Sequence, residues 1–389
     1  MSFPHSGICI IRCRDTYLVH NKNFMKKVAL LTIHLGANFG SNLQTIATVE
    51  TLKKHDCETE VVNYIPDRCT WNRFFKDGFK SAISVAKMFI LLPVKIANSY
   101  IYNSYLSKYV QVSKNIYAKD DFMSACPKAN VYVTGSDQVW NSKHNEGLDR
   151  RYYFDGFPDD AVKIAYSSSI GREELDVKEY AEVRRMLGSY KAISVREASA
   201  GRLIEAMGYR AIHLLDPTFM LTRENWKNYM SKRLVKEPYL IVYLPYNVHD
   251  KSLIYQSIRK IADKKQLKVI SFSWHILPDK LADKTVFFSN PGDFLSLMYY
   301  ADYVMTNSFH GTAFSINLNK QFSVYLPSSF GTRIVSILDL CGLGGRLLEP
   351  AEIISDGKMD ETIDYMSVNV VLDEERRKAH TFLEQALKD

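Results

Sequence analysis

The feature that most limits the fold of this chain is a regular alternation of short apolar runs with segments of helical periodicity. The first apolar run, 28–33, ends in the turn sequence GANFGSN at 36–42. A helical pattern over 43–54 and a strand pattern over 58–64 follow. A strand, a glycine-rich turn, a helix and a second strand in this order form a βαβ unit, which is built on a parallel sheet.

The same alternation continues along the rest of the chain. Further strand candidates lie at 131–134, 164–167, 192–194 and 212–215, with a helical pattern over 197–207. After Trp226 the alternation starts again, with strand patterns at 239–244, 268–273, 303–308 and 322–326 and helical patterns at 251–264, 292–301 and 310–318. Strands that alternate with helices predict a parallel sheet covered by helices, so we expect two such sheets.

We therefore predict an α/β protein with two doubly wound, Rossmann-like domains that face each other across a cleft, as in glycosyltransferase-B-like enzymes. The first domain spans 25–225, and the second spans 226–389 and includes a C-terminal helix, with 222–238 as the linker. Ligands of doubly wound sheets bind beyond the carboxyl ends of the strands. Motifs at those positions are therefore the first candidates for a functional site.

Residues 1–24 differ from the sequence that follows them. MKKVALLTIHLG, which begins at Met25, is typical of a bacterial protein start that leads directly into a first strand. We interpret 1–24 as a loose arm or a mis-assigned upstream start. The stretch has no apolar region long enough for a secretory signal, which favours a cytoplasmic location.

Composition and charge argue against several classes of protein. Hydrophobic residues make up 46% of the chain and charged residues 24%, values typical of a globular protein and not of a disordered one. The six cysteines match neither a zinc ribbon nor a CxxC pair, so we expect free thiols and no metal site. The net charge of +7 fits anionic substrates or a membrane surface, and the dispersed basic residues do not indicate nucleic acid.

One segment, 75–110, interrupts the first domain. It combines Lys76, Lys80, Lys87 and Lys95 with many large apolar residues. A basic amphipathic helix of this kind could lie on a membrane interface. It could equally be a helical excursion that packs against its own domain. Because the chain has no uninterrupted apolar run of about 18 residues, no membrane-spanning helix is predicted.

Four predicted strands end in polar motifs. These are VTGSDQVWN at 133–141, SVRE at 194–197, LLDPTF at 214–219 and TNSFHGTAFS at 306–315. The candidate site residues that they supply are Gly135, Ser136, Asp137, Trp140, Arg196, Asp216, Asn307, Ser308, His310 and Gly311.

Two of these positions suit a small anionic substrate. A helix N-terminus offers unpaired N–H groups and the positive end of a dipole, and His310, Gly311 and the residues after Arg196 lie at such places. Arginine can hold a carboxylate or phosphate bidentately. Histidine can carry a proton near neutral pH, which general acid catalysis requires. The pattern indicates a two-domain enzyme with an anion-binding cleft.

The same residues also have purely structural interpretations. Arg196 and Glu197 could form a salt bridge at a helix start. Asp216 could close a turn or cap a helix, and Ser136 and Asp137 could also be caps. Residue chemistry alone does not decide between these interpretations.

Taken together and in order, the motifs resemble those of the polysaccharide pyruvyl transferase family. The resemblance rests on NFGSNLQ (38–44), GSDQVWN (135–141), AYSSSIG (165–171), SVRE, LLDPTF and PGDFLSLMYYADYVMTNSFHGTAFSI (291–316). It extends from about residue 28 to about residue 340. The first of these motifs adds Asn38, Gly40 and Ser41 to the candidate substrate-binding residues.

The resemblance implies an enzyme that moves the enolpyruvyl group of phosphoenolpyruvate onto a sugar as a pyruvate ketal, with no metal or other cofactor. The acceptor would be a sugar of a surface-polysaccharide precursor, carried on a lipid such as undecaprenyl diphosphate. Such an acceptor implies a location in the cytoplasm, at the inner face of the cell membrane.

The resemblance also assigns roles to residues. His310 corresponds to the family's proposed general acid, and Arg196 to its phosphoenolpyruvate-binding arginine. Some members have a second basic residue just before the histidine, where this chain has Ser308 and Phe309. We therefore expect Arg333 or Lys320 to supply the second positive charge.

Two other functions stay open at this point. The first is a glycosyltransferase of the same architecture that uses a nucleotide sugar, although no Glu-rich ribose-binding motif is obvious near the C-terminus. The second is a non-catalytic protein of glycan assembly, which the intact Arg196 and His310 disfavour. A dehydrogenase is disfavoured because GANFGSN matches GxGxxG poorly.

Overall fold

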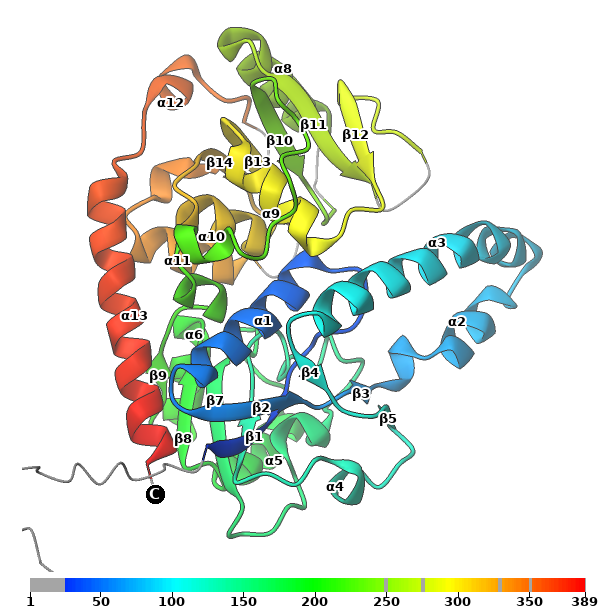
Figure 1. Cartoon of the computed structure of the whole chain (residues 1–389), viewed down its shortest axis with the longest axis vertical. Helices are drawn as coiled ribbons and strands as arrows, with labels where there is room; N and C mark the ends of the chain where they lie inside the picture. Colours follow the sequence, from blue (N-terminus) through cyan, green and yellow to red (C-terminus); the bar gives the residue numbers. More distant parts are fainter. Residues whose placement is uncertain (1–24, 248–250, 274–276, 328–330, 350–351, 389) are drawn as a thin grey trace, which may run out of the picture.

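Two parallel β-sheets organise the chain (Figure 1). The computed structural model describes residues 25–247, 251–273, 277–327, 331–349 and 352–388, so the interpretation of residues 1–24 falls outside the described part of the chain. Every strand pair in both sheets is parallel. The predicted α/β fold with two helix-covered parallel sheets is confirmed.

The sheet of the N-terminal half has seven strands in the order β4-β2-β1-β6-β7-β8-β9. The strands are β1 (Lys26–Leu31), β2 (Cys57–Val61), β4 (Gln111–Val112), β6 (Val131–Thr134), β7 (Val162–Ser168), β8 (Ala192–Val195) and β9 (Ile212–His213). β1 lies between β2 and β6, where Val28 pairs with Thr59 and Val131. The last four residues of β1 are apolar and buried, as expected for a strand that helices cover on both faces.

The sheet of the C-terminal half has six strands in the order β12-β11-β10-β13-β14-β15. The strands are β10 (Tyr239–Tyr243), β11 (Lys268–Ser273), β12 (Lys284–Phe287), β13 (Tyr303–Thr306), β14 (Gln321–Tyr325) and β15 (Leu347–Leu348). All five residues of β10 are buried. A separate pair joins β3 (Tyr64–Ile65) to β5 (Ile116–Tyr117).

Helices connect the strands. In the N-terminal half they are α1 (Phe39–Lys53), α2 (Trp71–Gly78), α3 (Ala82–Ser107), α4 (Phe122–Ala125), α5 (Val177–Leu187) and α6 (Ala198–Ala206). In the C-terminal half they are α7 (Arg223–Trp226), α8 (Lys251–Lys265), α9 (Pro291–Tyr300), α10 (Phe309–Asn317), α11 (Thr332–Leu340), α12 (Asp356–Asp360) and α13 (Tyr365–Leu387). Short 3-10 turns lie between them, one of them at Pro217–Met220.

Helix α1 begins four residues earlier than its sequence pattern predicts. The side chain of Asn38 accepts a hydrogen bond from the backbone N–H of Ser41, so the asparagine caps the helix and its first turn forms inside the predicted loop. This turn places Phe39 in the apolar core of the C-terminal half, with ring centroids 5.2 Å from Phe272 and 4.8 Å from Phe294. Helix α1 therefore joins the two halves of the molecule.

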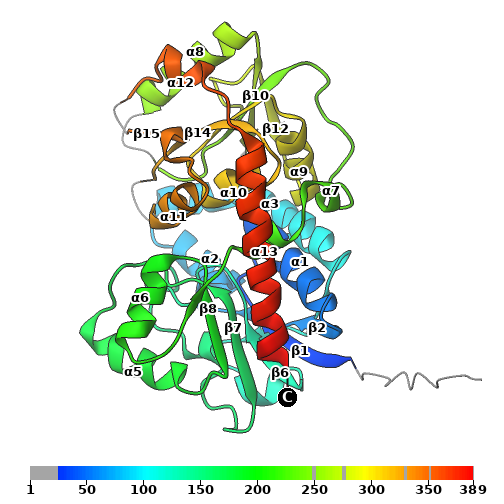
Figure 2. The same cartoon turned by 90° about the vertical axis from the view of Figure 1, so that its left-hand side faces the viewer.

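The C-terminal helix α13 also spans both halves (Figure 2). Near its start, Val368 and Leu372 pack in the core around β10 and α10. Near its end, Phe382 and Leu383 pack in the core that contains Val28 of β1. The chain thus leaves the second sheet and returns to the first.

Helices α2 and α3 form an arm that extends away from both sheets (Figure 1). The end of α3 packs through the buried Tyr102 and Leu106, whereas Ile83 and Phe89 nearer its start are 70% and 62% exposed. By length and hydropathy, Ile83–Ser107 meets the criteria for a membrane-spanning helix. The sequence search for one uninterrupted apolar run missed this segment because lysines interrupt it.

Candidate active site

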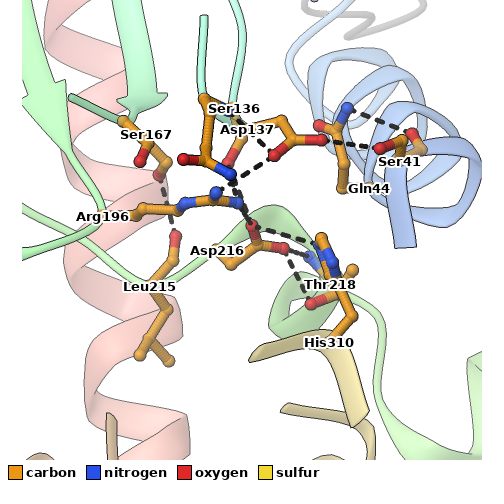
Figure 3. Close-up of polar contacts among 12 residues, drawn as sticks. Ser41, Gln44, Ser136, Asp137, Ser167, Arg196, Leu215, Asp216, Thr218 and His310 are labelled. Carbon is orange, nitrogen blue, oxygen red and sulfur yellow. Dashed lines mark hydrogen bonds and ion pairs between the residues drawn. The ribbon is translucent and has the colours of Figure 1, made fainter. Parts of the chain in front are cut away.

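The polar motifs of both halves meet between the two sheets (Figure 3). Asp137 follows β6, Arg196 follows β8 and Asp216 follows β9, all at carboxyl ends of strands in the first sheet. His310 lies in the first turn of α10, directly after β13 of the second sheet. Side chains that are far apart in the sequence therefore form one buried polar cluster.

Arg196 is the centre of this cluster, and its side chain is fully buried. Its guanidinium donates to Asp216 Oδ2 over 2.7 Å and to Asp137 Oδ1 over 3.2 Å. The Ser136 hydroxyl also donates to Asp216 Oδ2, over 3.0 Å. Burial would raise the pKa of Asp216, but the charges of Arg196 and then His310 bring it below its usual value. Asp216 is therefore an anion that pairs with Arg196.

The simple pairing of Arg196 with Glu197 at a helix start is not what the structure shows. The closest approach of Arg196 Nε to Glu197 Oε2 is 4.0 Å, too long for a hydrogen bond. Glu197 instead accepts through Oε1 from the backbone N–H groups of Ile170 and Gly171 and from the hydroxyl of Ser169. Its second carboxylate oxygen is buried without a partner.

His310 is buried against α1. Its Nε2 lies 3.9 Å from Asp216 Oδ2, and a Cβ atom at Gly40 would lie 2.0 Å from its Nδ1. Only a glycine at position 40 therefore lets the first turn of α1 approach the imidazole. Burial lowers the pKa of His310 to about 4, although the charges of Asp216 and Asp137 act in the opposite direction. In this state the imidazole is neutral at pH 7.

Arg333, in the first turn of α11, brings a second guanidinium to the cluster. Its carbon Cζ lies 5.5 Å from the centroid of the Phe309 ring, and that of Arg196 lies 4.9 Å from the same centroid. Arg333 is buried, yet within the described part of the chain it has neither a hydrogen bond nor an ion pair. Burial, and next the charge of Arg196, lowers the pKa of Arg333. No carboxylate of the described residues is in direct contact with this cation, although the charges of Asp137 and Glu197 act on it from a distance.

Three buried nitrogen atoms of the cluster have no hydrogen-bond partner among the described residues. They are Nε of Arg196, Nε of Arg333 and Nε2 of His310. Buried polar atoms without partners are rare in folded proteins, because each costs free energy. Three such atoms on two cations and a histidine form a site that an anion with several oxygen atoms would complete.

Two further predicted residues reach the cluster from α1. The Ser41 hydroxyl donates to Asp137 Oδ2 over 2.6 Å, and Asn38 caps the helix that carries it. Asp137 has a positive φ of 73°, a conformation that a non-glycine residue seldom adopts. The strained backbone aims one carboxylate at both Ser41 and Arg196.

The structure places other predicted residues in supporting positions. A Cβ atom at Gly135 would lie 2.9 Å from Leu30, and one at Gly311 would lie 2.2 Å from Thr306 Oγ1. The side chain of Asn307 bonds to the backbone of Tyr246. These contacts pack the loops beneath the cluster.

Neither Ser308 nor Trp140 has a side-chain hydrogen bond to a charged group of the cluster among the described residues. Ser308 is the N-cap residue of α10, without a side-chain capping bond. The Trp140 ring is 2% exposed, stacks on Tyr153 and donates to the carbonyl of Tyr152. In this conformation the structure does not bring Trp140 into the cluster.

Sequence reasoning gave no role to Phe309 or His144. Phe309 presents its ring to both guanidinium groups, but nothing in the sequence distinguishes it from an ordinary apolar residue of α10. His144 is solvent-exposed, yet partial desolvation lowers its pKa, and it lies close enough to Asp137 and Arg68 for their charges to act on it. It follows the GSDQVWN motif by three residues, which was the only available signal.

No group of three or more His, Cys, Asp and Glu side chains that could hold a metal ion occurs in the described residues.

Several solved structures are similar to this chain over most of its length. A putative UDP-N-acetylglucosamine 2-epimerase from Listeria monocytogenes matches 92% of this chain and 90% of its own, with 10% identity and a TM-score of 0.47. The UDP-GlcNAc 2-epimerase from Neisseria meningitidis bound to UDP-GlcNAc matches 94% and 95%, with 10% identity and a TM-score of 0.44. Anabaena Alr3699/HepE in complex with UDP and glucose matches 92% and 97%, with 9% identity and a TM-score of 0.46.

These likenesses concern the fold alone, and the fold is established here by strand order and direction. No curated protein sequence matches the chain. The family model described as polysaccharide pyruvyl transferase matches residues 38–329, which include every residue of the polar cluster except Arg333. The chain therefore belongs to the polysaccharide pyruvyl transferase family.

Proposed function

We propose that the protein transfers the enolpyruvyl group of phosphoenolpyruvate to two hydroxyl groups of a sugar in a polysaccharide precursor, forming a pyruvate ketal and releasing phosphate. The observation that carries this proposal is the set of three unpartnered nitrogens on Arg196, Arg333 and His310. Family membership supports a pyruvyl donor and a polysaccharide acceptor. The proposal goes beyond family membership in naming phosphoenolpyruvate as the donor.

Phosphoenolpyruvate has the charge that this cluster lacks. Its carboxylate and phosphate oxygens accept hydrogen bonds from guanidinium groups, which favour planar, bidentate contacts with such anions. Among the described residues, Nε of Arg333 and Nε of Arg196 have no hydrogen-bond partner, while the other nitrogens of Arg196 donate to Asp137 and Asp216. We assign one anionic group of the donor chiefly to Arg333, and the other to the side of Arg196 that carries Nε.

The chemistry then needs a proton at C3 of the donor. Protonation of C3 by His310 turns C2 into an oxocarbenium-like centre, which one sugar hydroxyl attacks. The C2–O bond to phosphate breaks and phosphate leaves with the electron pair, after which the second hydroxyl closes the ketal. Of the two hydroxyl protons, one restores His310 and the other leaves with phosphate. Asp216, 3.9 Å from His310 Nε2, stabilises the imidazolium.

A bound dianion explains how His310 can be an acid although its pKa is about 4 in the free protein. Negative charge beside an imidazole favours its protonated form. Donor binding therefore raises the pKa of His310, and the imidazole takes up from solvent the proton that it then transfers to C3.

We further propose that the acceptor is lipid-linked, for example through undecaprenyl diphosphate, and that the enzyme works in the cytoplasm at the inner membrane face. The α2–α3 arm supports this proposal. Residues 71–100 contain five basic side chains and one acidic one, together with exposed Phe79, Phe89 and Ile90. A basic apolar surface of this kind suits an anionic bilayer.

The proposed activity is tested by incubating the pure protein with phosphoenolpyruvate and lipid-linked sugars. We expect phosphate release and a product that is heavier by one pyruvyl group. Replacing phosphoenolpyruvate by UDP-sugars tests the glycosyltransferase alternative. Transfer from a UDP-sugar, or no acceptor-dependent phosphate release in any mixture, would contradict the proposal.

The role of His310 is tested in the same assay with His310→Ala, which should lose roughly 10²–10⁴-fold of the rate. His55→Ala is the matched control. His55 is half-buried and precedes β2, so it lies at the amino ends of the strands, away from the polar cluster at their carboxyl ends. A His310→Ala enzyme that keeps more than about a tenth of the rate would remove this histidine from the acid role.

A further inference from the structure

A cavity of about 900 Å³ lies where the α2–α3 arm meets the first sheet. Its wall comes from the arm, from the loop that joins β1 to α1 and from the segments after β2 and β4. The chemistry assigned above to the polar cluster does not use this cavity. Its volume lies in the range of small-molecule binding sites.

The lining combines aromatic rings with amide groups. Trp71 and Phe74 provide the rings, and Asn98 and Asn103 of α3 are among the amides. Asn98 is 8% exposed, whereas Asn103 is exposed and donates to the hydroxyl of Ser99 over 3.4 Å. An apolar ring face beside amide groups is suited to a sugar, which presents C–H groups on one face and hydroxyls around its edge.

The charge of the lining is positive. Arg68 and Lys95 both line the cavity, and no Asp or Glu does. The ammonium of Lys95 lies 4.2 Å from the centroid of the Phe74 ring and 5.0 Å from that of Trp71, and it has no ion-pair partner among the described residues. A cation held on ring faces without a carboxylate is available for an anionic ligand group such as phosphate.

Two segments that line the cavity are connected to residues near the polar cluster. Gly36 and Ala37 line it and immediately precede Asn38, which caps the helix that packs on His310. On the other side, Arg68 donates to Asn145, which is the neighbour of His144 in the sequence. A ligand in the cavity would therefore have one end toward the proposed reacting groups.

The opposite side of the cavity is continuous with the exposed apolar surface of the arm. Trp71 and Leu91 line the cavity, yet they are 41% and 38% exposed. The cavity thus has a polar end toward His310, the cation of Lys95, and an apolar end at the outer face of the arm. A ligand with a sugar, a phosphate and a lipid in that order would fit these three regions.

We propose that this cavity binds the glycosyl-phosphate headgroup of the acceptor, with the sugar toward His310 and the phosphate at Lys95. The proposal rests on the proposed function, which gives the reason why the protein binds such a ligand. The binding itself can be measured without phosphoenolpyruvate, so a failure here is distinct from a failure of the pyruvyl transfer.

The test uses N-acetylglucosamine 1-phosphate as the probe and isothermal titration calorimetry as the measurement. We expect Lys95→Gln to weaken binding by roughly tenfold or more, because a hydrogen bond to a charged group is lost. Asn98→Leu, which removes the amide and keeps the bulk, should also weaken binding. Lys87→Gln is the matched control, because it removes the same charge from the same helix outside the cavity.

Two further arms identify the site and the ligand. Arg333→Met should leave the binding of the sugar phosphate unchanged, whereas it would abolish binding if the phosphate occupied the polar cluster. Free N-acetylglucosamine and inorganic phosphate should each bind more weakly than the sugar phosphate. Absence of binding, or equal losses in Lys95→Gln and Lys87→Gln variants that melt like the wild type, would overturn the proposal.

Discussion

Two buried arginines beside His310 differ in what compensates their charge. Arg196 pairs with Asp137 and Asp216, whereas Arg333 has no ion pair in the described protein. Removing one partner of a buried ion pair leaves an uncompensated charge, which is costly, but removing an unpaired buried charge relieves such a cost. The two residues should therefore respond oppositely to the same substitution.

We predict that Arg196→Met lowers the free energy of unfolding by about 3–5 kcal/mol, because it leaves two buried carboxylates unpaired. Arg333→Met should be neutral or stabilising in the absence of ligand. Both variants should lose the thermal stabilisation that phosphoenolpyruvate gives the wild type. Urea unfolding and melting with and without the donor measure these effects, and a strongly destabilised Arg333→Met protein would show that Arg333 has a structural partner.

The pKa of His310 leads to a second prediction at this scale. In the free protein it is lowered from 6.5 to about 4, so near neutral pH the imidazole is neutral and lacks the second ring proton. A bound dianion raises this pKa, and the complex should take up as much as one proton as it forms. Calorimetric titration of phosphoenolpyruvate in buffers of different ionisation enthalpy measures that uptake. His310→Gln is the control, and equal proton uptake by both proteins would contradict the assignment.

The lowered pKa also has a consequence for stability. Because the folded state binds this proton less tightly than the unfolded state, the contribution of His310 to stability is present above about pH 6.5. It is lost as the pH falls from there toward 4. His310→Gln should flatten that part of the stability profile.

Part of this site was predictable from sequence. Arg196, Asp216 and His310 were identified because they follow strands, and the carboxyl ends of parallel strands share one edge of a sheet. The sequence could not show which polar groups would be left without partners, because that depends on packing between the two sheets. Phe309 is the clearest example, since only the fold brings its ring to two arginines.

At the scale of elements, the α2–α3 arm is the least compact part of the described chain. Its first half exposes Ile83, Phe89 and Ile90, while its last turns are fixed by Tyr102 and Leu106. Because these last turns are held in the protein core, the whole length of α3 is not free to cross a bilayer. An interfacial position, with the exposed face in the headgroup region, is compatible with both observations.

We predict that the protein binds to vesicles of phosphatidylcholine mixed with phosphatidylglycerol, and that salt weakens this binding. Replacing Lys76, Lys80 and Lys87 by Gln should weaken it further, because each lysine contributes about 1 kcal/mol near an anionic surface. Co-sedimentation at low and high salt is the measurement.

The matched control replaces the exposed Lys265, Lys280 and Lys284 of the second half. Equal pelleting of the two triple variants, or none on anionic vesicles by the wild type, would contradict membrane docking. If the exposed face instead joins two copies of the chain, the wild type should sediment as a dimer without vesicles.

The strands were easier to predict than the arm. A buried parallel strand such as β10 appears in the sequence as a continuous apolar run between polar turns. Helix α3 combines apolar residues with lysines and contains Pro93, so its sequence fits a buried, an interfacial or a spanning helix. Its partly packed position depends on contacts with α1 and α9 that no local pattern encodes.

At the scale of the molecule, two elements connect the halves. Phe39 inserts into the core of the second half, and α13 contributes to the cores of both. The division of the chain at residues 225 and 226 stays a prediction. The apolar positions of α13 indicate a buried stripe, but they do not show which sheet the stripe covers.

Because α13 contacts both cores, a substitution near its C-terminal end should destabilise the whole protein and not α13 alone. Leu383 is fully buried in the core that contains β1, whereas Val370 on the same helix is 66% exposed. We predict that Leu383→Ala lowers the free energy of unfolding by about 2–5 kcal/mol. Val370→Ala should change it by no more than about 0.5 kcal/mol.

Urea unfolding followed by circular dichroism distinguishes two outcomes for these variants. If α13 and Phe39 couple the halves, wild type and Leu383→Ala should each unfold in one transition, with the midpoint of the variant shifted to lower urea. The physical reason is that each half covers part of the apolar stripe of α13. If one half unfolds, the part of the stripe that it covered becomes exposed to water. If Leu383→Ala instead produces two separate transitions, with the second at the midpoint of the wild type, the halves are independent and α13 only rests on the first sheet.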